Sequence, residues 1–138
     1  MNIKIKKLTS TAKLPTKKDC DVGYDLYADS IETDGDAVII HTGIAIEMEK
    51  CFWALIADRS SMGKKGFNVH GGIIDNSYRG EIIVILYKHK EFDINKVINV
   101  GDKIAQLIIM QQFSFDVLEV SELSVTERNE KGFGSTGK

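Results

Sequence analysis

The sequence predicts an all-β protein, and three observations lead to that prediction. Apolar residues recur with a period of two in residues 3–8 and 40–48, which is typical of strands with one buried face. Short runs rich in β-branched or aromatic residues predict strands buried on both faces at 52–57, 82–87 and 104–110. No segment keeps a helical apolar pattern for three turns, although residues 90–100 could form a short helical turn. A β-barrel or β-sandwich follows.

Size and composition predict one folded domain. The chain has 138 residues and 43% hydrophobic content, which suffices for one core. Composition changes only in residues 127–138, where glycines alternate with polar residues around Phe133. We therefore expect a single β-barrel domain over residues 1–126 and a flexible, glycine-rich C-terminal tail over residues 127–138.

The charge balance argues against two classes of partner. Eighteen basic and 20 acidic residues give a net charge of -2, so we expect no nucleic-acid and no membrane partner held by bulk electrostatics. No stretch approaches the roughly 20 apolar residues that span a bilayer, and the N-terminus alternates Ile and Lys instead of presenting a signal peptide. We expect a cytoplasmic protein, with the nucleus as the alternative for a eukaryotic or viral source.

Spacing of the metal-binding residue types argues against a zinc hydrolase. The three histidines, His41, His70 and His89, are too far apart to share one helical face. Cys20 and Cys51 are too few for a disulfide framework and fit no common metal motif. The chain also contains no P-loop sequence. Any phosphate ligand must therefore be held by local groups of another kind.

Two stretches in the first half carry groups suited to phosphate chemistry. In residues 21–28, Asp25 could hold a hydrated Mg²⁺, which needs only one or two protein oxygens beside substrate phosphates. The alternative is a bulged strand with surface carboxylates. Arg59, Ser60 and Ser61 follow a buried run, and a guanidinium fork with hydroxyls and backbone N–H groups can converge on a phosphate. Their alternative is a solvated basic turn.

Residues 71–80 predict a β-hairpin with a polar turn. Asp75 lies at the mouth of that turn, directly after the apolar pair Ile73 and Ile74. A carboxylate in this position can accept a proton from a bound water. The alternative is that Asp75 and Asn76 cap the turn through local hydrogen bonds.

The last two stretches lie in a strand and in the tail. Gln106 is a lone amide in an apolar run, and a buried amide without partners costs about 1–3 kcal/mol, so it must bond either backbone or ligand. In the tail, Phe133 could stack on a flat ring, while Arg128, Ser135 and Thr136 could clasp a phosphate as a lid. The alternative is a disordered, solvated end.

Taken in order, these five stretches resemble the five motifs of the homotrimeric dUTPase family, from Asp21 to Gly137. The segments that carry the resemblance are Arg59-Ser60, Gly72-x-Ile74-Asp75-x-x-Tyr78-x-Gly80, Ile104-Ala105-Gln106-Leu107 and Gly132-Phe133-Gly134-Ser135. The resemblance implies a jelly-roll-like β-barrel and a homotrimer whose active sites combine residues of three chains. It also implies hydrolysis of dUTP to dUMP and pyrophosphate, which would keep uracil out of DNA and supply dUMP for thymidylate synthesis.

The same resemblance implies a role for each site residue. Asp75 would activate the water that attacks the α-phosphorus in line, and Asp25 would hold Mg²⁺ through its water shell. The remaining residues would bind substrate. The α- and β-phosphates would be held by Arg59, Ser60, Ser61 and Gln106, and the γ-phosphate by Arg128, Ser135 and Thr136. Phe133 would lie over the uracil, the backbone around Gly72 and Ile74 would pair with its edge, Tyr78 would pack against the deoxyribose, and Gly134 would also contact the substrate.

One departure from the family pattern concerns the phosphate-binding turn. Asp58 stands where family members usually carry proline before the Arg-Ser pair.

Two other functions compete with hydrolysis. A dCTP deaminase would share the fold, but it would need a glutamate base at the pyrimidine C4. A nucleotide-sensing module without turnover would have no need of Asp75.

Overall fold

The computed structural model describes residues 2–88 and 97–130, and strands dominate this part of the chain. The elements are β1 (Lys4–Lys7), β2 (Tyr24–Tyr27), β3 (Ser30–Asp34), β4 (Ala37–His41), β5 (Ile44–Glu47), β6 (Phe52–Ala57), α1 (Ser60–Lys64), β7 (Phe67–His70), β8 (Ile73–Ile74), β9 (Ile83–Lys88) and β10 (Lys103–Gln111). None of the helical structure described here is long or apolar enough to cross a membrane. The helical turn considered for residues 90–100 falls mostly on residues 89–96, outside the described residues.

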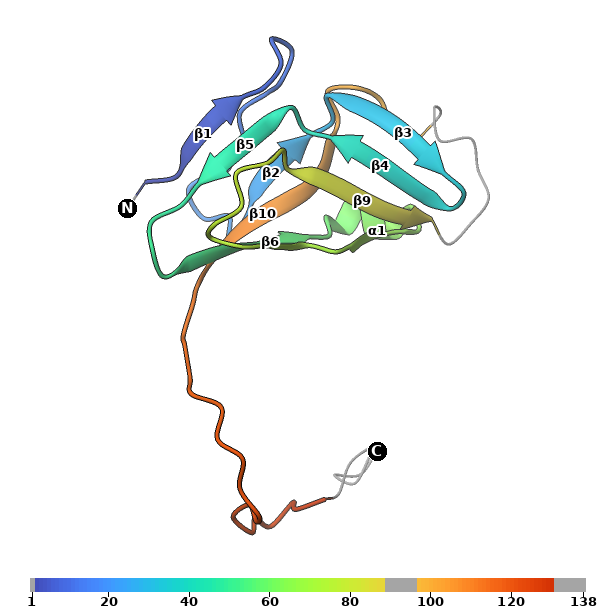
Figure 1. Cartoon of the computed structure of the whole chain (residues 1–138). Helices are drawn as coiled ribbons and strands as arrows, with labels where there is room; N and C mark the ends of the chain where they lie inside the picture. The colour runs from blue at the N-terminus through green and yellow to red at the C-terminus, as the bar shows by residue number, and fades with distance from the viewer. Residues whose placement is uncertain (1, 89–96, 131–138) are drawn as a thin grey trace.

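The strands form antiparallel sheets that face one another (Figure 1). One four-stranded sheet has the order β2-β10-β6-β8, and a second has the order β3-β4-β9-β7. We call them the β10 sheet and the β9 sheet. A third sheet pairs β1 with β5. The all-β prediction and its jelly-roll-like arrangement are confirmed, although no continuous ladder of the described strands closes the barrel.

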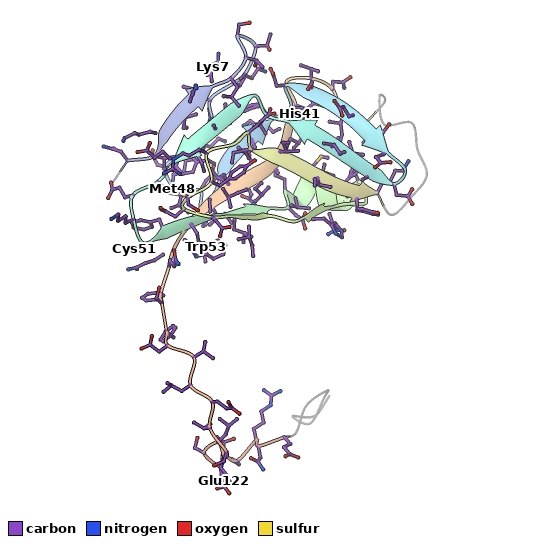
Figure 2. The ribbon with its side chains drawn as sticks, in the orientation of Figure 1. Lys7, His41, Met48, Cys51, Trp53 and Glu122 are labelled. Carbon is purple, nitrogen blue, oxygen red and sulfur yellow. The ribbon has the colours of Figure 1, made fainter. Side chains whose placement is uncertain are left out.

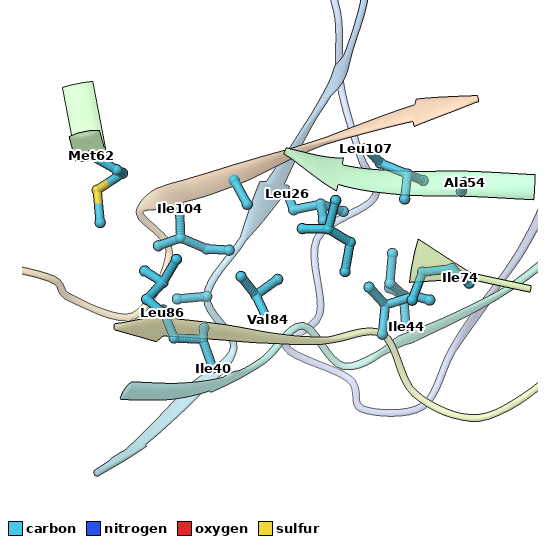
Figure 3. Close-up of a cluster of buried hydrophobic side chains, with 14 of the residues drawn as sticks. Leu26, Ile40, Ile44, Ala54, Met62, Ile74, Val84, Leu86, Ile104 and Leu107 are labelled. Atoms are coloured by element: carbon cyan, nitrogen blue, oxygen red, sulfur yellow. The ribbon is translucent and has the colours of Figure 1, made fainter. Parts of the chain in front are cut away.

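The core lies between the β10 sheet and the β9 sheet (Figure 3). Alternate side chains of β9 point inward, so that Val84 and Leu86 are buried. They pack with Ile104 and Leu107 of β10, which are 0% and 1% exposed. Full burial of each such side chain contributes about 1.5–3 kcal/mol. The alternation along β9 is that of a strand with one buried face.

The prediction that residues 82–87 are buried on both faces is wrong within a single chain. Ile85 and Tyr87 point away from the core and are 37% and 42% exposed. Successive side chains of a strand lie on opposite faces, and the described residues of one chain cover only one face of β9. The outer face of β9 therefore presents apolar side chains to solvent.

The predicted hairpin at residues 71–80 is also wrong. β8 pairs with β6 in the β10 sheet, whereas β9, which follows the turn, belongs to the other sheet. Asn76 explains this path, because its Nδ2 atom donates to the carbonyl oxygens of Glu49 and Phe52, each at 2.8 Å. Those bonds fasten the turn to the connection between β5 and β6. The chain then crosses to the β9 sheet.

After β10 ends at Gln111, the chain leaves the sheets as an extended segment (Figures 1 and 2). We call residues 112–130 the C-terminal arm. The predicted domain boundary between residues 126 and 127 falls within this arm. The arm exposes a series of large apolar side chains: Phe113, Phe115, Val117, Leu118, Val120, Leu123 and Val125.

An ion pair between His41 and Glu81 joins β4 to the chain before β9. His41 Nδ1 lies 2.9 Å from Glu81 Oε2, and Glu32 Oε1 lies 3.7 Å from the other ring nitrogen. The hydrogen bond with Glu81, aided by the charge of Glu32, raises the pKa of His41 above its ordinary 6.5. Protonated His41 therefore stabilises the folded chain, fully below pH 6.5 and decreasingly as the pH rises through the raised pKa.

Replacing His41 with asparagine should flatten the dependence of stability on pH above 6.5. The measurement is the urea midpoint of unfolding between about pH 6 and 9. His70→Asn serves as the matched control, because His70 contacts the ring of Tyr87 rather than a carboxylate. Equal slopes for wild type and His41→Asn would contradict this assignment.

Candidate active site

Three of the predicted stretches meet on neighbouring strands of the β10 sheet. Gln106 of β10 pairs with Asp25 of β2 on one side and with Ala57 of β6 on the other. A Cβ atom at Gly23 would lie 2.7 Å from Gln106 Oε1, so glycine is needed there. The antiparallel register thus places a carboxylate, an amide and the entrance to the Arg59 turn side by side.

Gln106 has a backbone partner, which was one of the two outcomes considered for it. Its Nε2 atom donates to the carbonyl oxygen of Asp58 at 2.8 Å. Because Asp58 directly precedes Arg59, this bond ties the Arg59 turn to the central strand of the sheet. The amide remains half-buried rather than enclosed, so a ligand can also reach it.

Asp25 lies between two cations. Its Oδ1 atom is 2.9 Å from Arg59 Nε, and its Oδ2 atom is 2.7 Å from Lys103 Nζ. Arg59 also donates to the carbonyl oxygen of Lys103 at 3.0 Å. The hydrogen bond with Asp25 raises the pKa of Lys103, so this lysine stays charged. Two positive charges against one negative charge leave a net positive cluster, which suits a polyphosphate.

The short helix α1 places the two predicted serines beside Arg59. The backbone of Arg59 is extended, and its carbonyl oxygen accepts the N–H groups of Met62 and Gly63 at 2.8 and 3.0 Å. Met62 is 4% exposed and anchors the turn on the core. The hydroxyls of Ser60 and Ser61 are left exposed on the outside of the turn.

Asp75 is exposed directly after β8, and a buried residue precedes it. Ile74 is 9% exposed and pairs with Ala54 of β6. The carbonyl oxygen of Gly72 accepts the N–H of Ile56 at 2.7 Å. A side chain at Gly72 would collide with the carbonyl oxygen of Ile56, so this close approach requires glycine.

Tyr78 and Arg79 shape the other end of this segment. The Tyr78 hydroxyl donates to the carbonyl oxygen of Glu81 at 3.0 Å, and the ring lies where a Cβ atom at Gly80 would be. Arg79 donates to the carbonyl oxygens of Asn76 and Tyr78 at 2.6 and 2.9 Å. The hydroxyl bond and the contact with Gly80 fix the position of the Tyr78 ring, while 42% of the residue stays exposed.

Asp75 and the cationic cluster are separated within one chain. Ile74 pairs with Ala54, near the start of β6, whereas Arg59 follows the end of that strand. Extended chain rises about 3.3 Å per residue, which puts Arg59 roughly 16 Å beyond Ala54. The structure brings Asp25, Arg59 and Gln106 together but leaves the predicted catalytic carboxylate at the opposite end of β6.

The tail residues are only partly described. Arg128 lies on the C-terminal arm, whereas the predictions for Phe133, Gly134, Ser135 and Thr136 concern residues outside the described part. Lys103 and Arg79 were not singled out from the sequence. Lys103 could have been recognised as a candidate site residue, because it lies three positions before Gln106 in the same apolar strand.

The donor set near Asp25 suits a hydrated Mg²⁺ better than a directly bound metal. Among residues 2–88 and 97–130, no group of three or more His, Cys, Asp or Glu side chains could hold an ion. Cys20 and Cys51 are free and exposed. Mg²⁺ keeps several waters and is commonly held by one or two carboxylates together with substrate phosphates. Asp25 supplies one half-buried carboxylate beside the Arg59 turn, and a hydrated Mg²⁺ would have to share that carboxylate with Arg59 and Lys103.

An antiparallel β-sandwich with this cationic cluster defines a class: all-β proteins that bind a polyphosphate at one end of a sheet. The sequence model of the dUTPase family matches residues 10–137. The chain therefore belongs to the dUTPase family, which confirms the resemblance seen in the motifs.

Relatives and solved structures agree with this membership. A Variola virus protein named deoxyuridine 5'-triphosphate nucleotidohydrolase is 40% identical over 138 residues, covering 98% of this chain and 92% of the relative. The relative of the same name from Vaccinia virus strain Copenhagen has the same identity and coverage. The solved dUTPase of Staphylococcus bacteriophage 80alpha with dUPNHPP has a TM-score of 0.85 and 25% identity, covering 99% of both chains.

A further solved relative concerns the metal. A structure of the dUTPase from phage phi11 of S. aureus is described as revealing the coordination of a structural Mg(II) ion. It has a TM-score of 0.75 and 21% identity, covering 91% of this chain and 100% of the other. At that identity the likeness concerns the fold.

Proposed function

We propose that this chain is a dUTP diphosphatase, which hydrolyses dUTP to dUMP and pyrophosphate. Family membership and relatives at 40% identity support the reaction. The observation that carries it is the meeting of Asp25 of β2, Gln106 of β10 and Arg59, which follows β6, because that cluster can receive a triphosphate. The reaction would keep uracil out of DNA and supply dUMP for thymidylate synthesis.

In the proposed mechanism Asp75 is the general base. Its exposed carboxylate takes a proton from the water that attacks the α-phosphorus in line. The α- and β-phosphates are held by Arg59, Ser60, Ser61 and Gln106, so that the pyrophosphate leaves opposite the attacking water. Mg²⁺ held through its water shell by Asp25 would neutralise charge on the phosphates.

Base and sugar recognition depend on the segment after β7. Its backbone at Gly72 and Ile74 would pair with the edge of uracil, and a site that hydrogen-bonds the correct base leaves groups unpaired with the wrong one. Tyr78 would pack against the deoxyribose. The tail would then close over the substrate, with these residues in contact: Arg128, Phe133, Gly134, Ser135 and Thr136.

We propose further that the active unit is a homotrimer with shared sites. The separation of Asp75 from Arg59 along β6 supports this, because one chain cannot present both to one phosphate. The exposed apolar face of β9, with Ile85 and Tyr87, also supports assembly. Exposed apolar surface of this kind is typical of protein interfaces.

The C-terminal arm gives a second argument for assembly. Its apolar side chains find no cover among the described residues of their own chain, and an arm that long can reach another protomer. The same chain carries an open groove of about 410 Å³ beside β1. Apolar residues make up most of its lining: Ile3, Ile5, Pro15, Val22, Tyr24, Met48, Phe52, Leu107 and Ile109. We propose that the arm of a second copy covers this groove.

The test of the reaction is pyrophosphate release from the four canonical deoxynucleoside triphosphates, dUTP and UTP, each with Mg²⁺. Release from dUTP alone is expected. Ammonia formed from dCTP would favour the deaminase instead. Binding of dUTP without release of pyrophosphate would favour a nucleotide-sensing module.

A cytoplasmic location is proposed on composition alone, with the nucleus as the alternative for a eukaryotic or viral source. The two cysteines, Cys20 and Cys51, are free, which fits a reducing compartment where disulfides are rare. Fractionation of producing cells, followed by detection of the chain with an antibody, is the direct measurement. Recovery in a secreted or membrane fraction would refute the proposal.

Replacing Tyr78 with alanine should relax discrimination against ribose. The ring is held by its bond to the Glu81 carbonyl and by the space at Gly80, so it forms a fixed wall. Its removal should lower the ratio of kcat/KM for dUTP to that for UTP by about tenfold or more. Tyr78→Phe is the matched control, which keeps the ring and loses only the hydroxyl. An unchanged ratio in the alanine variant would refute this role.

A further inference from the structure

Asp58 connects the two main sheets through its side chain. Its Oδ1 atom accepts the backbone N–H of Val69 at 2.6 Å, and its Oδ2 atom accepts Asn68 Nδ2 at 3.2 Å. Asp58 follows β6 of the β10 sheet, whereas Asn68 and Val69 belong to β7 of the β9 sheet. The carboxylate therefore bridges two elements that share no strand pairing.

The bond to Val69 is made at the edge of a sheet. β7 is the terminal strand in the order β3-β4-β9-β7, so one side of its backbone has no neighbouring strand in that sheet. The carboxylate of Asp58 occupies this side at Val69. A hydrogen bond from a backbone N–H to a carboxylate is roughly twice as strong as one between neutral groups.

Asp58 is held at both its side chain and its main chain. The carbonyl oxygen of Asp58 accepts a hydrogen bond from Gln106 Nε2 at 2.8 Å, while its carboxylate accepts the backbone N–H of Val69 in β7. The loop between Asp58 and Val69 contains Arg59 and both serines of the phosphate-binding turn. Its two ends are thus fastened to each other, and one end is also fastened to the central strand.

We propose that Asp58 is a positioning residue that sets the phosphate-binding turn, by clamping its entrance to β7. The proposal deepens the proposed function and rests on it, because it assumes that Arg59, Ser60 and Ser61 hold substrate phosphates. Proline, usual in the family at this position, would fix its own φ near about −65°. Here a hydrogen-bonded clamp takes the place of that backbone restriction.

The Asp58 clamp should affect how the substrate phosphates are bound and should leave binding of the uracil base unchanged. The segment proposed to read uracil has its own anchors, since Ile74 pairs with Ala54 and Gly72 bonds Ile56. Loss of the Asp58 carboxylate leaves those bonds in place. It frees the start of the Arg59 turn, and small misplacement of groups that position a substrate can cost up to about 100-fold in rate.

The experiment compares Asp58→Ala and Asp58→Asn in the full-length protein. The amide introduced by Asp58→Asn is uncharged yet still presents an oxygen to the N–H of Val69, so this variant should restore most of the function. Asp34→Ala is the matched control, because Asp34 is an exposed aspartate at the end of β3. Four quantities are measured. The first two are kcat for dUTP and the affinity for the dUTP analogue dUpNHpp, in which an NH group replaces one bridging oxygen of the triphosphate. The other two are competitive inhibition by deoxyuridine, which carries no phosphate, and amide hydrogen exchange at Val69.

Asp58→Ala is expected to lower kcat and the affinity for dUpNHpp by about tenfold or more, with deoxyuridine inhibition unchanged. Val69 should exchange about tenfold faster than in wild type, because its acceptor is gone. Asp58→Asn should stay within about threefold of wild type. If Asp58→Ala does not fold, Asp58→Ser replaces it, since a serine hydroxyl is too short to make the bond.

Two outcomes would overturn the proposal. One is wild-type kcat and dUpNHpp affinity in the variant that lacks the carboxylate. The other is an equal loss of deoxyuridine and dUpNHpp binding, which would indicate general disruption of the site. If wild type and Asp34→Ala release no pyrophosphate from dUTP, the proposed reaction fails instead, while Val69 exchange and dUpNHpp affinity still test the clamp.

Discussion

Asp75→Asn is expected to reduce kcat for dUTP by about 10²–10⁴-fold, the range that a positioned general base contributes. Asparagine has nearly the same shape as aspartate but cannot accept the proton of the attacking water at neutral pH. Affinity for dUpNHpp should change little, because the proposed phosphate and base contacts are made by other residues. The measurements are pyrophosphate release and calorimetric titration with the analogue.

The fold of this variant should be unaffected, because Asp75 is exposed and its turn is held by Asn76 and Arg79. Asp34→Asn is the matched control for removal of one surface carboxylate. Near-normal hydrolysis by Asp75→Asn would move the role of base to another group. A fall in thermal stability with a proportional fall in activity would indicate a structural role.

The choice between catalysis and turn capping at Asp75 could not be made from local sequence. Asp75 and Asn76 are both residue types that cap turns. In the structure Asn76 makes the anchoring bonds, to the carbonyl oxygens of Glu49 and Phe52. These two acceptors lie more than twenty positions earlier in the chain, as the separations of 27 and 24 residues show. Only the fold shows that Asn76 anchors the turn while the neighbouring carboxylate is exposed.

The strands were predictable because a period of two can be read along the chain, whereas strand pairing cannot. Gln106 meets Asp25 and Ala57 through the register of β10 with its two neighbours. That register depends on contacts between distant segments, as does the Lys103 ion pair with Asp25. For the same reason the hairpin at residues 71–80 was expected and the crossing to the β9 sheet was not.

An apolar run in the sequence indicates that the side chains are buried, but it does not show whether the same chain or another protomer covers them. The run at 82–87 was expected to be covered on both faces, but one face of β9 stays exposed in a single chain. A trimer would reconcile the sequence pattern with the structure, because a strand face buried between chains is as rich in apolar residues as one buried within a chain. The exposed apolar series along the C-terminal arm would have the same explanation. Assembly and the arm can therefore be tested together.

Two truncations of the C-terminal arm are expected to separate assembly from catalysis. A chain ending at Glu127 lacks Arg128 and the glycine-rich tail but keeps the apolar part of the arm. It should fold and assemble as wild type, and kcat should fall by about 100-fold or more, because the residues proposed to close over the substrate are gone. A chain ending at Gln111 lacks the whole arm and should lose the trimer as well.

The physical reason is the apolar area that each truncation removes. Full burial of one Val, Leu or Phe side chain contributes about 1.5–3 kcal/mol, and the arm exposes seven such residues between Phe113 and Val125. Light scattering gives the assembly state, thermal unfolding gives the stability, and pyrophosphate release gives the rate. A monomeric or unfolded chain ending at Glu127 would rule out the lid. A chain ending at Gln111 that stays trimeric would show that the arm is dispensable for assembly, which would leave the outer face of β9 as the surface that joins the protomers.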